Sequence, residues 1–190
     1  MIDPFIVVFD IETTDAQLSL PQVVEIGAIK LNPALEIIDD YETFVRPPNL
    51  EFFSEFSTQI TGISRDQIET APRWQEVWRS WAEFTKFKKC RLMSWGSFDT
   101  FLLRLEYHRL RLSYPHNDMP ICIASMAYMH AYTRGWKPRG FSLKHICKEF
   151  GIEYRPNHRA KFDAALAVRV LRELVRPDKS ASEPFKIYEV

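Results

Sequence analysis

The sequence has little cysteine, and this narrows the classes of site that it can hold. Its 190 residues include three cysteines, Cys90, Cys122 and Cys147, and no CxxC pair. A thiolate zinc site is therefore not expected, and three widely spaced thiols indicate a reducing compartment, which we take to be the cytoplasm. Each cysteine is most simply interpreted as a small core residue.

Long apolar runs and a basic N-terminal stretch are also missing. No eighteen consecutive residues are apolar, so no membrane span is expected. The chain passes from Met1 directly toward a strand, so we expect no signal peptide. Repeats are absent, and the length and 46% apolar content suit one folded domain. We assign this domain to residues 1–177, and the polar residues 178–190 to a C-terminal tail.

A net charge is absent as well, because 25 basic residues match 25 acidic ones. The two signs are nevertheless segregated. Residues 1–85 contain 5 Lys+Arg and 15 Asp+Glu, whereas residues 86–190 contain 20 and 10. A face that binds a polyanion beside an acidic metal site would produce this asymmetry. Solvated side chains scattered over the surface would explain it equally well.

Two acids end the most apolar segment of the chain. Residues 5–12, FIVVFDIE, form a run typical of a strand buried on both faces. Side chains two apart in a strand share a face, so Asp10 and Glu12 are expected to point the same way. Like charges this close oppose folding unless a positive group lies between them. The pair therefore predicts a site for a divalent cation with oxygen ligands.

The rest of the chain is expected to alternate between strands and helices. An Asn32-Pro33 turn indicates an antiparallel hairpin. The segment from Ser64 begins with capping-box spacing. This order predicts an α/β domain with a mixed five-stranded sheet, flanked by helices and with its first strand central. The further strands are expected at 23–31, 37–45, 91–95 and 121–124, and the helices at 64–68, 74–86, 98–112, 124–132, 142–150 and 161–175.

An acid on an apolar helix face is the third candidate ligand. Asp163 shares its face of the last helix with Leu166, Ala167, Val170 and Leu174. A carboxylate placed there is rarely buried without a partner. That partner is either a metal ion or a basic group in a core salt bridge.

Asp99 and His158 are weaker candidates when each is taken alone. Asp99 stands at the start of a helix that Ser97 could cap, where an acid complements the helix dipole. His158 lies in a predicted loop five residues before Asp163, and an isolated loop histidine is usually only exposed.

Taken together, these residues resemble the motifs of the DEDDh 3′→5′ exonucleases, which have the ribonuclease H-like fold. The sequence FDIETT at 9–14 is similar to the first motif of that family and SWGSFD at 94–99 to the second. The sequence HRAKFDA at 158–164 is similar to the third, with its H-x-x-x-x-D spacing. The similarity extends from about residue 5 to 176. Residues 59–63, 95–99 and 141–145 most resemble the branch that contains 3′hExo and the sporulation inhibitors, whose members mostly act on RNA.

The resemblance implies a metal-dependent phosphodiesterase. Two Mg²⁺ or Mn²⁺ ions would be held by Asp10, Glu12, Asp99 and Asp163, since hard cations prefer oxygen ligands. His158 would act as the general base that takes a proton from the attacking water. The product would be a nucleoside 5′-monophosphate.

The resemblance also implies contacts with the substrate. Thr13 and Thr14 would lie near the terminal sugar, and Ile60 and Phe98 would pack against the last bases. The threonines could instead cap a turn, and Ile60 could be a core residue. Basic residues that could hold phosphates are Lys137, Arg139, Lys144, Arg155 and Arg159.

Three alternatives to a single-strand exoribonuclease stay open. A DNA exonuclease of the proofreading or repair type differs in its tolerance of the 2′-hydroxyl, which the sequence does not reveal. A regulatory module could keep the fold and lose the reaction, although such proteins usually lack one of the five motif residues. An α/β domain whose acids only cap and pair would need five coincidences at these spacings.

Overall fold

The computed structural model describes residues 4–14, 21–86, 89–116, 120–154 and 159–176. The predicted tail and two candidate residues, Arg155 and His158, lie outside these ranges. Within them, the strands are β1 (Phe5–Thr13), β2 (Val23–Leu31), β3 (Ile37–Phe44), β4 (Cys90–Ser94) and β5 (Ile121–Cys122). The helices are α1 (Glu55–Thr61), α2 (Arg65–Thr70), α3 (Trp74–Thr85), α4 (Phe98–Arg109), α5 (Ile123–Thr133), α6 (Leu143–Glu149) and α7 (Ala160–Leu174), with a 3₁₀ turn at Leu50–Phe52.

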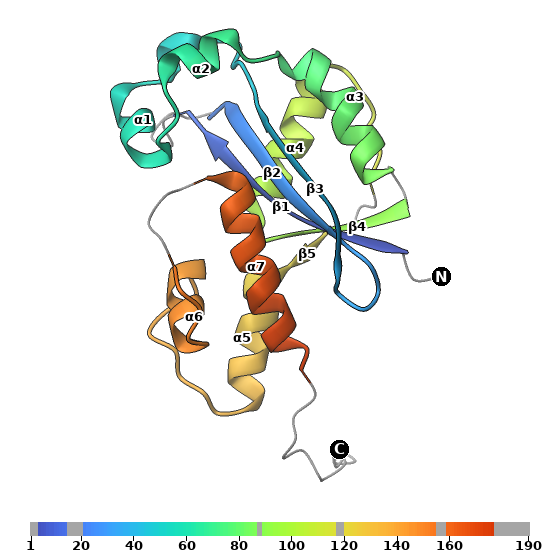
Figure 1. Ribbon diagram of the computed structural model, residues 1–190, viewed down its shortest axis with the longest axis vertical. Helices are drawn as coiled ribbons and strands as arrows, with labels where there is room; N and C mark the ends of the chain where they lie inside the picture. Colours follow the sequence, from blue (N-terminus) through green and yellow to red (C-terminus); the bar gives the residue numbers. More distant parts are fainter. Residues whose placement is uncertain (1–3, 15–20, 87–88, 117–119, 155–158, 177–190) are drawn as a thin grey trace, which may run out of the picture.

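The strands form one mixed sheet in the order β3-β2-β1-β4-β5, with β1 at its centre (Figure 1). The pairs β1–β2 and β2–β3 are antiparallel, and β1–β4 and β4–β5 are parallel. The predictions of a five-stranded mixed sheet, a β2–β3 hairpin and a central first strand are confirmed. The central strand is the most apolar one because helices cover both faces of the sheet there, so that side chains on both faces of the strand are buried.

Two helical layers enclose the sheet. Val8 and Met93 pack with α5, α6 and α7 on one face, and Val7, Phe9 and Leu92 pack with α3 and α4 on the other. Alternation along β1 thus divides its side chains between two cores. The acids at positions 10 and 12 follow the parity of Val8, so they point to the α7 side. Among the described helices, none combines the length and apolar character that crossing a bilayer requires.

Helix α1 is the main element that the sequence analysis missed. Ser54 caps it by accepting from the N–H of Ser57, and Gly62 ends it with a φ of 70°. The helix has seven residues and exposes Phe56 and Ile60, so it lacks the buried apolar stripe from which a helix is predicted in a sequence. Two smaller expectations were also wrong. The Ser97 side chain makes no capping bond in α4, and β4 begins and ends one residue earlier than predicted.

Candidate active site

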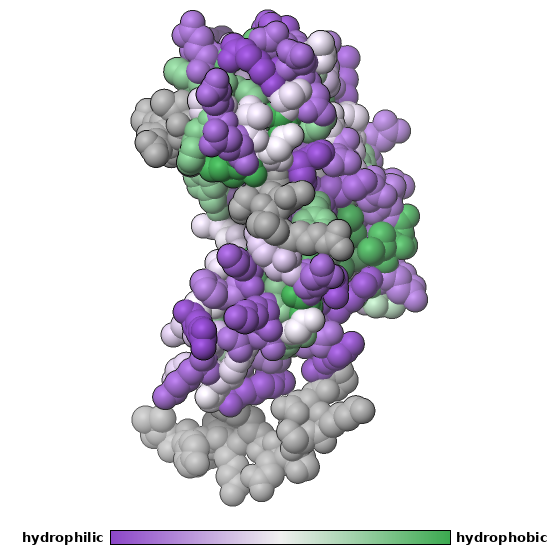
Figure 2. Space-filling view, turned by 60° about the vertical axis from the view of Figure 1, so that its left-hand side comes forward, coloured by the Kyte–Doolittle hydropathy of each residue, from purple (hydrophilic) through white to green (hydrophobic). Residues whose placement is uncertain are grey.

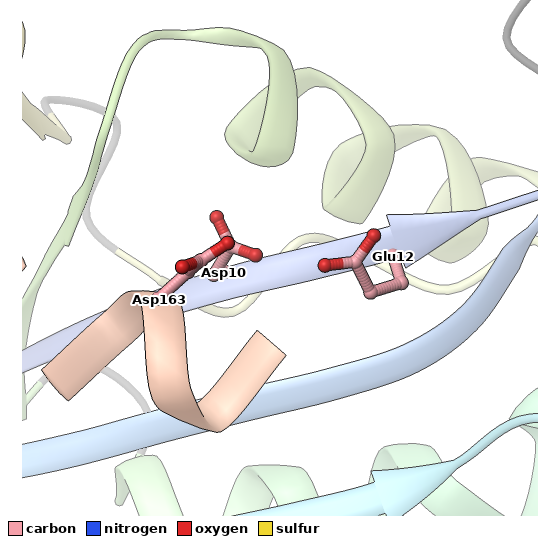
Figure 3. Close-up of side chains that lie close together, drawn as sticks. All are labelled: Asp10, Glu12 and Asp163. Carbon is pink, nitrogen blue, oxygen red and sulfur yellow. The ribbon is translucent and has the colours of Figure 1, made fainter. Parts of the chain in front are cut away.

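Three carboxylates meet at one end of the central strand (Figure 3). Asp10 and Glu12 project from β1 on the same face, as predicted, and Asp163 reaches them from the first turn of α7. One carboxylate oxygen from each of the three lies within 4.8 Å of the other two. Asp163 is only 7% exposed, because the apolar stripe of α7 that carries it packs on the sheet. The structure thus brings together residues from opposite ends of the chain.

Asp99 stands beside this cluster and outside the 4.8 Å group. It lies in the first turn of α4 and is 7% exposed. The backbone N–H groups of Asp99 and Ile11 donate hydrogen bonds to its carboxylate. The bond from Ile11 joins the start of α4 to β1 next to Asp10. Asp99 therefore has a fixed place at the site, which a role in the helix dipole alone would not require.

Burial raises the pKa of these carboxyl groups, and their neighbours raise it further. The pKa of Glu12 rises to about 8, first through burial and then through Asp163, although Arg159 lowers it. Burial raises the pKa of Asp99 to about 7, and Asp163 adds to the rise. The pKa of Asp10 lies well above its ordinary value because of burial, Asp99 and Glu12. Binding of a proton or a cation neutralises such groups and so stabilises the folded protein.

A divalent cation fits this set of donors. The clustered atoms are carboxylate oxygens, which hard cations prefer, and they converge on one point from two elements. Burial and the neighbouring carboxylates raise the pKa of Asp10 and of Glu12, so a bound cation would stabilise their ionised forms. Hence the residues present suit a divalent cation.

A pocket of about 450 Å³ opens next to the carboxylates. Asp10, Asp99 and Asp163 line it together with Trp95, Phe98, Ser142, Leu143, Lys144 and Tyr154. The pocket therefore combines acids, aromatic rings and a lysine. Figure 2 turns the side with α1 and α6 forward and shows a mainly hydrophilic face.

Local hydrogen bonds place Lys144 at this pocket. Ser142 caps α6 by accepting from the N–H of His145 at 3.4 Å. The Trp95 indole N–H donates to the carbonyl of Phe141 at 3.1 Å, which joins the end of β4 to the loop before α6. The second residue of α6, Lys144, therefore comes to the rim of the carboxylate site. Of the five predicted phosphate contacts, it alone lines this pocket among the described residues.

Tyr154 is a pocket residue that the sequence analysis missed. Its ring is half-buried, and burial, followed by the charge of Asp163, raises the pKa of its phenol. A tyrosine after a helix carries no distinctive spacing, so no pattern in the sequence could have revealed it.

The predicted substrate contacts differ in their surroundings. Phe98 lines the pocket, is 50% exposed and stacks on Phe101 with 6.4 Å between ring centroids. Ile60 is 40% exposed, so its interpretation as a core residue was wrong, but it does not line the described pocket. Thr13 is half-buried at the end of β1. The Thr14 hydroxyl accepts from the N–H of Gln22 at 3.0 Å, which is the turn-closing role considered above.

Part of the charge asymmetry reflects pairing inside the molecule. Arg159, a predicted phosphate contact, instead binds Glu25 and Glu42 with its guanidinium. Lys161 pairs with Asp40 at 2.8 Å. Basic residues of the second half thus neutralise acids of the first, whereas Lys137 and Arg139 are exposed.

Comparisons with known proteins agree with this geometry. The family described as Exonuclease (RNase_T) matches residues 7–171, which is most of the chain. Among curated proteins, the PolC-type DNA polymerase III of Lactococcus lactis subsp. lactis is 30% identical over 172 residues. This alignment covers 87% of the chain but 10% of the polymerase, so the chain spans about a tenth of the length of the curated relatives it matches.

Solved structures show the same fold. The nuclease domain of 3′hExo, described as a DEDDh family member bound to rAMP, is 26% identical with a TM-score of 0.71, and the alignment covers 90% of this chain and 92% of that one. Escherichia coli exonuclease I in complex with a dT13 oligonucleotide is 16% identical with a TM-score of 0.75, over 90% and 41% of the two chains. The chain belongs to the exonuclease family, and its fold and sequence motifs are those of the DEDDh type.

Proposed function

We propose that the protein removes nucleotides from single-stranded 3′ ends, with RNA preferred over DNA, and releases nucleoside 5′-monophosphates. The observation that carries this proposal is the cluster of Asp10, Glu12 and Asp163 oxygens within 4.8 Å, beside a pocket lined by Lys144. The preference for RNA is supported by the similarity to the 3′hExo nuclease domain, which is described as bound to rAMP and aligns over nearly its full length.

The four acids Asp10, Glu12, Asp99 and Asp163 would hold two divalent ions, either Mg²⁺ or Mn²⁺. When bound, the ions supply positive charge that opposes the negative charge developing on the phosphodiester. Three elements fix these acids before substrate arrives, since β1 carries the first pair, the first turn of α4 carries Asp99 and the packed stripe of α7 carries Asp163. A preorganised site of this kind needs little rearrangement during the reaction.

The chain's other side chains would position the substrate and move the proton. Lys144 would attract the phosphate, and Phe98 would stack on the base of the terminal nucleotide. Thr13 and Thr14 would contact its sugar through their backbone and hydroxyl groups, and Ile60 would contact the adjoining base. His158 would take the proton from the attacking water, because a neutral imidazole is the side chain best suited to that transfer near pH 7.

A DNA exonuclease is the second candidate function. It is favoured by the PolC-type polymerase, which is 30% identical to this chain over 172 residues. The two functions differ in whether the sugar site accepts, requires or rejects a 2′-hydroxyl. A regulatory binding module is a weaker third possibility, because the chain keeps all four acids and the histidine.

The test uses 5′-labelled oligomers of one sequence, as single-stranded RNA, hairpin RNA and single-stranded DNA. Each is incubated with the purified protein in Mg²⁺, in Mn²⁺ and in EDTA. We expect a ladder that shortens from the 3′ end, fastest for single-stranded RNA and absent in EDTA. Faster decay of DNA would select the second candidate. No decay of any oligomer, with cellular function retained by Asp10→Ala, would select the regulatory module.

We also propose that the protein works in the cytoplasm. Cys90 and Cys147 are buried, and the three cysteines are widely spaced with no CxxC pair, which is typical of proteins from a reducing compartment. Chemical labelling of thiols in intact cells, followed by fractionation, tests both the redox state and the location. Recovery in a secreted fraction would contradict the proposal.

A further inference from the structure

Helix α7 begins without a cap of its own. Its N-cap residue, Arg159, makes no side-chain capping bond. The first N–H groups of a helix need acceptors from outside the helix. One acceptor comes from the neighbouring strand β2, where Glu25 accepts from the N–H of Ala160 at 3.1 Å. The carboxylate that caps α7 therefore lies 135 positions earlier in the chain.

The Arg159 guanidinium completes this arrangement. Its Nε donates to both Glu25 oxygens, at 3.0 and 3.2 Å, and its Nη2 donates to Oε1 at 2.8 Å. Glu25 is fully buried, and a buried carboxylate is tolerated only when its oxygens are well satisfied. In the part of the chain that the structure describes, its donors are Arg159, the N-cap residue of α7, and Ala160, the first residue of that helix. Although Glu25 is paired across the sheet with Glu12, its oxygens are directed to α7 and not to the cluster.

Gly27, two residues further along β2, lets the helix approach the strand. A Cβ added there would lie 2.0 Å from the backbone nitrogen of Lys161 and 2.4 Å from the carbonyl carbon of Ala160. The first turn of α7 thus rests on the backbone of β2. The same turn carries Asp163, whose N–H donates to the carbonyl of Arg159 at 3.0 Å.

We infer that Glu25 is a positioning residue of the active site. By binding Arg159 and Ala160, it fixes the first turn of α7 and so holds Asp163 at the distance from Asp10 and Glu12 that a bound cation needs. The inference rests on the proposed function, because it assigns Glu25 a task only if the three acids bind metal. Partners that orient metal ligands typically change metal affinity or activity by about 10–100-fold when they are altered.

Two variants that keep every charge test this role. Glu25→Asp shortens the side chain by one methylene and so withdraws its carboxylate. Arg159→Lys replaces the planar guanidinium, which donates from several nitrogens, with a single ammonium group. We expect each to lower Mn²⁺ affinity by about 10–100-fold in calorimetric titration, and to lower kcat with little change in KM for the oligomer. Asp40→Asn is the matched control. It removes the exposed Asp40–Lys161 ion pair, which also joins α7 to the hairpin, and should leave affinity and kcat unchanged.

Circular dichroism and thermal melting establish that each variant is folded at the assay temperature. Folded variants that bind Mn²⁺ as the wild type does would overturn the inference, even if their melting temperatures are lower. If Glu25→Asp does not fold, Arg159→Lys decides, since its side chain is 35% exposed. A wild type that binds Mn²⁺ but cleaves no oligomer would refute the proposed function alone, and a wild type that binds no Mn²⁺ would refute both.

Discussion

Asp10, on the central strand, and Asp163, on the last helix, place carboxylate oxygens within 4.8 Å of each other. Neither residue gains from this proximity in a metal-free protein, because two negative charges in a half-buried site repel. The arrangement is stable because β1 and α7 share a large apolar core that holds both residues in place. Electrostatic repulsion between the carboxylates therefore lowers the stability of the metal-free protein, and binding of a cation or a proton removes this repulsion.

Without metal, the melting temperature should fall as the pH rises from about 4.5, the ordinary pKa of glutamate, to about 8. Burial, aided by neighbouring acids, raises the pKa of Glu12 to about 8, and burial raises that of Asp99 to about 7. In this window the folded state binds more protons than the unfolded state, so stability decreases with pH. Calorimetry in EDTA at several pH values measures the trend.

Added Mn²⁺ should reverse this trend, because the ion binds the ionised carboxylates and competes with their protons. The increase in melting temperature on adding Mn²⁺ should be larger at pH 8 than at pH 5.5. A metal-free stability that is flat or rises between these values would show that the acids are already neutralised by other groups.

Asp10→Asn should change activity and stability in opposite directions. Loss of one ligand should lower the hydrolysis rate by about a thousandfold, corresponding to roughly 4 kcal/mol of transition-state stabilisation. At pH 8 in EDTA, the variant should melt above the wild type, because one repelling charge has been removed. Asp66→Asn, an identical change at an exposed position of α2, serves as the control. An Asp10→Asn protein that retains activity would remove this residue from the ligand set.

His158→Ala should separate proton transfer from metal binding. We expect turnover to fall by about two to four orders of magnitude while calorimetric Mn²⁺ affinity stays within error of the wild type. His108→Ala, at an exposed position of α4, should change neither quantity. An unchanged rate for His158→Ala would exclude it as the general base.

Lys144→Glu should weaken substrate binding through charge alone. Lys144 lines the pocket next to Asp10 and Asp163, so reversal of its charge should raise KM for single-stranded RNA by about tenfold at low salt. The increase should shrink in high salt because the exposed charge is screened. Arg79→Glu, on the helix layer that covers the opposite face of the sheet, provides a control of equal charge change. Equal KM increases for both variants would point to net charge as the cause.

Local patterns were enough to predict the central strand, the hairpin and the placement of three acids. The period of two along a strand places Asp10 and Glu12 on one face, and the stripe around Asp163 has the period of a helix face. Both periodicities come from backbone geometry and need no knowledge of neighbours. The motifs at 9–14, 94–99 and 158–164 likewise identified the family, which the match to residues 7–171 confirms.

Other parts of the site depend on contacts between distant segments. In the sequence, Glu25 is only one of two charged residues in an otherwise apolar strand, and the packing of α7 on β2 is what shows that it binds Arg159 and Ala160. Arg159 was expected to contact phosphate, but its guanidinium pairs with Glu25 and Glu42. A sequence does not reveal which basic groups are already paired with acids. Tyr154 reaches the carboxylates because of where the chain passes after α6. The sequence by itself determined which acids could bind a cation, because strand and helix periods decide which face of its element each side chain takes. Only the tertiary structure decided which charged side chains remain available to the substrate, because ion pairing depends on distances between elements far apart in the chain.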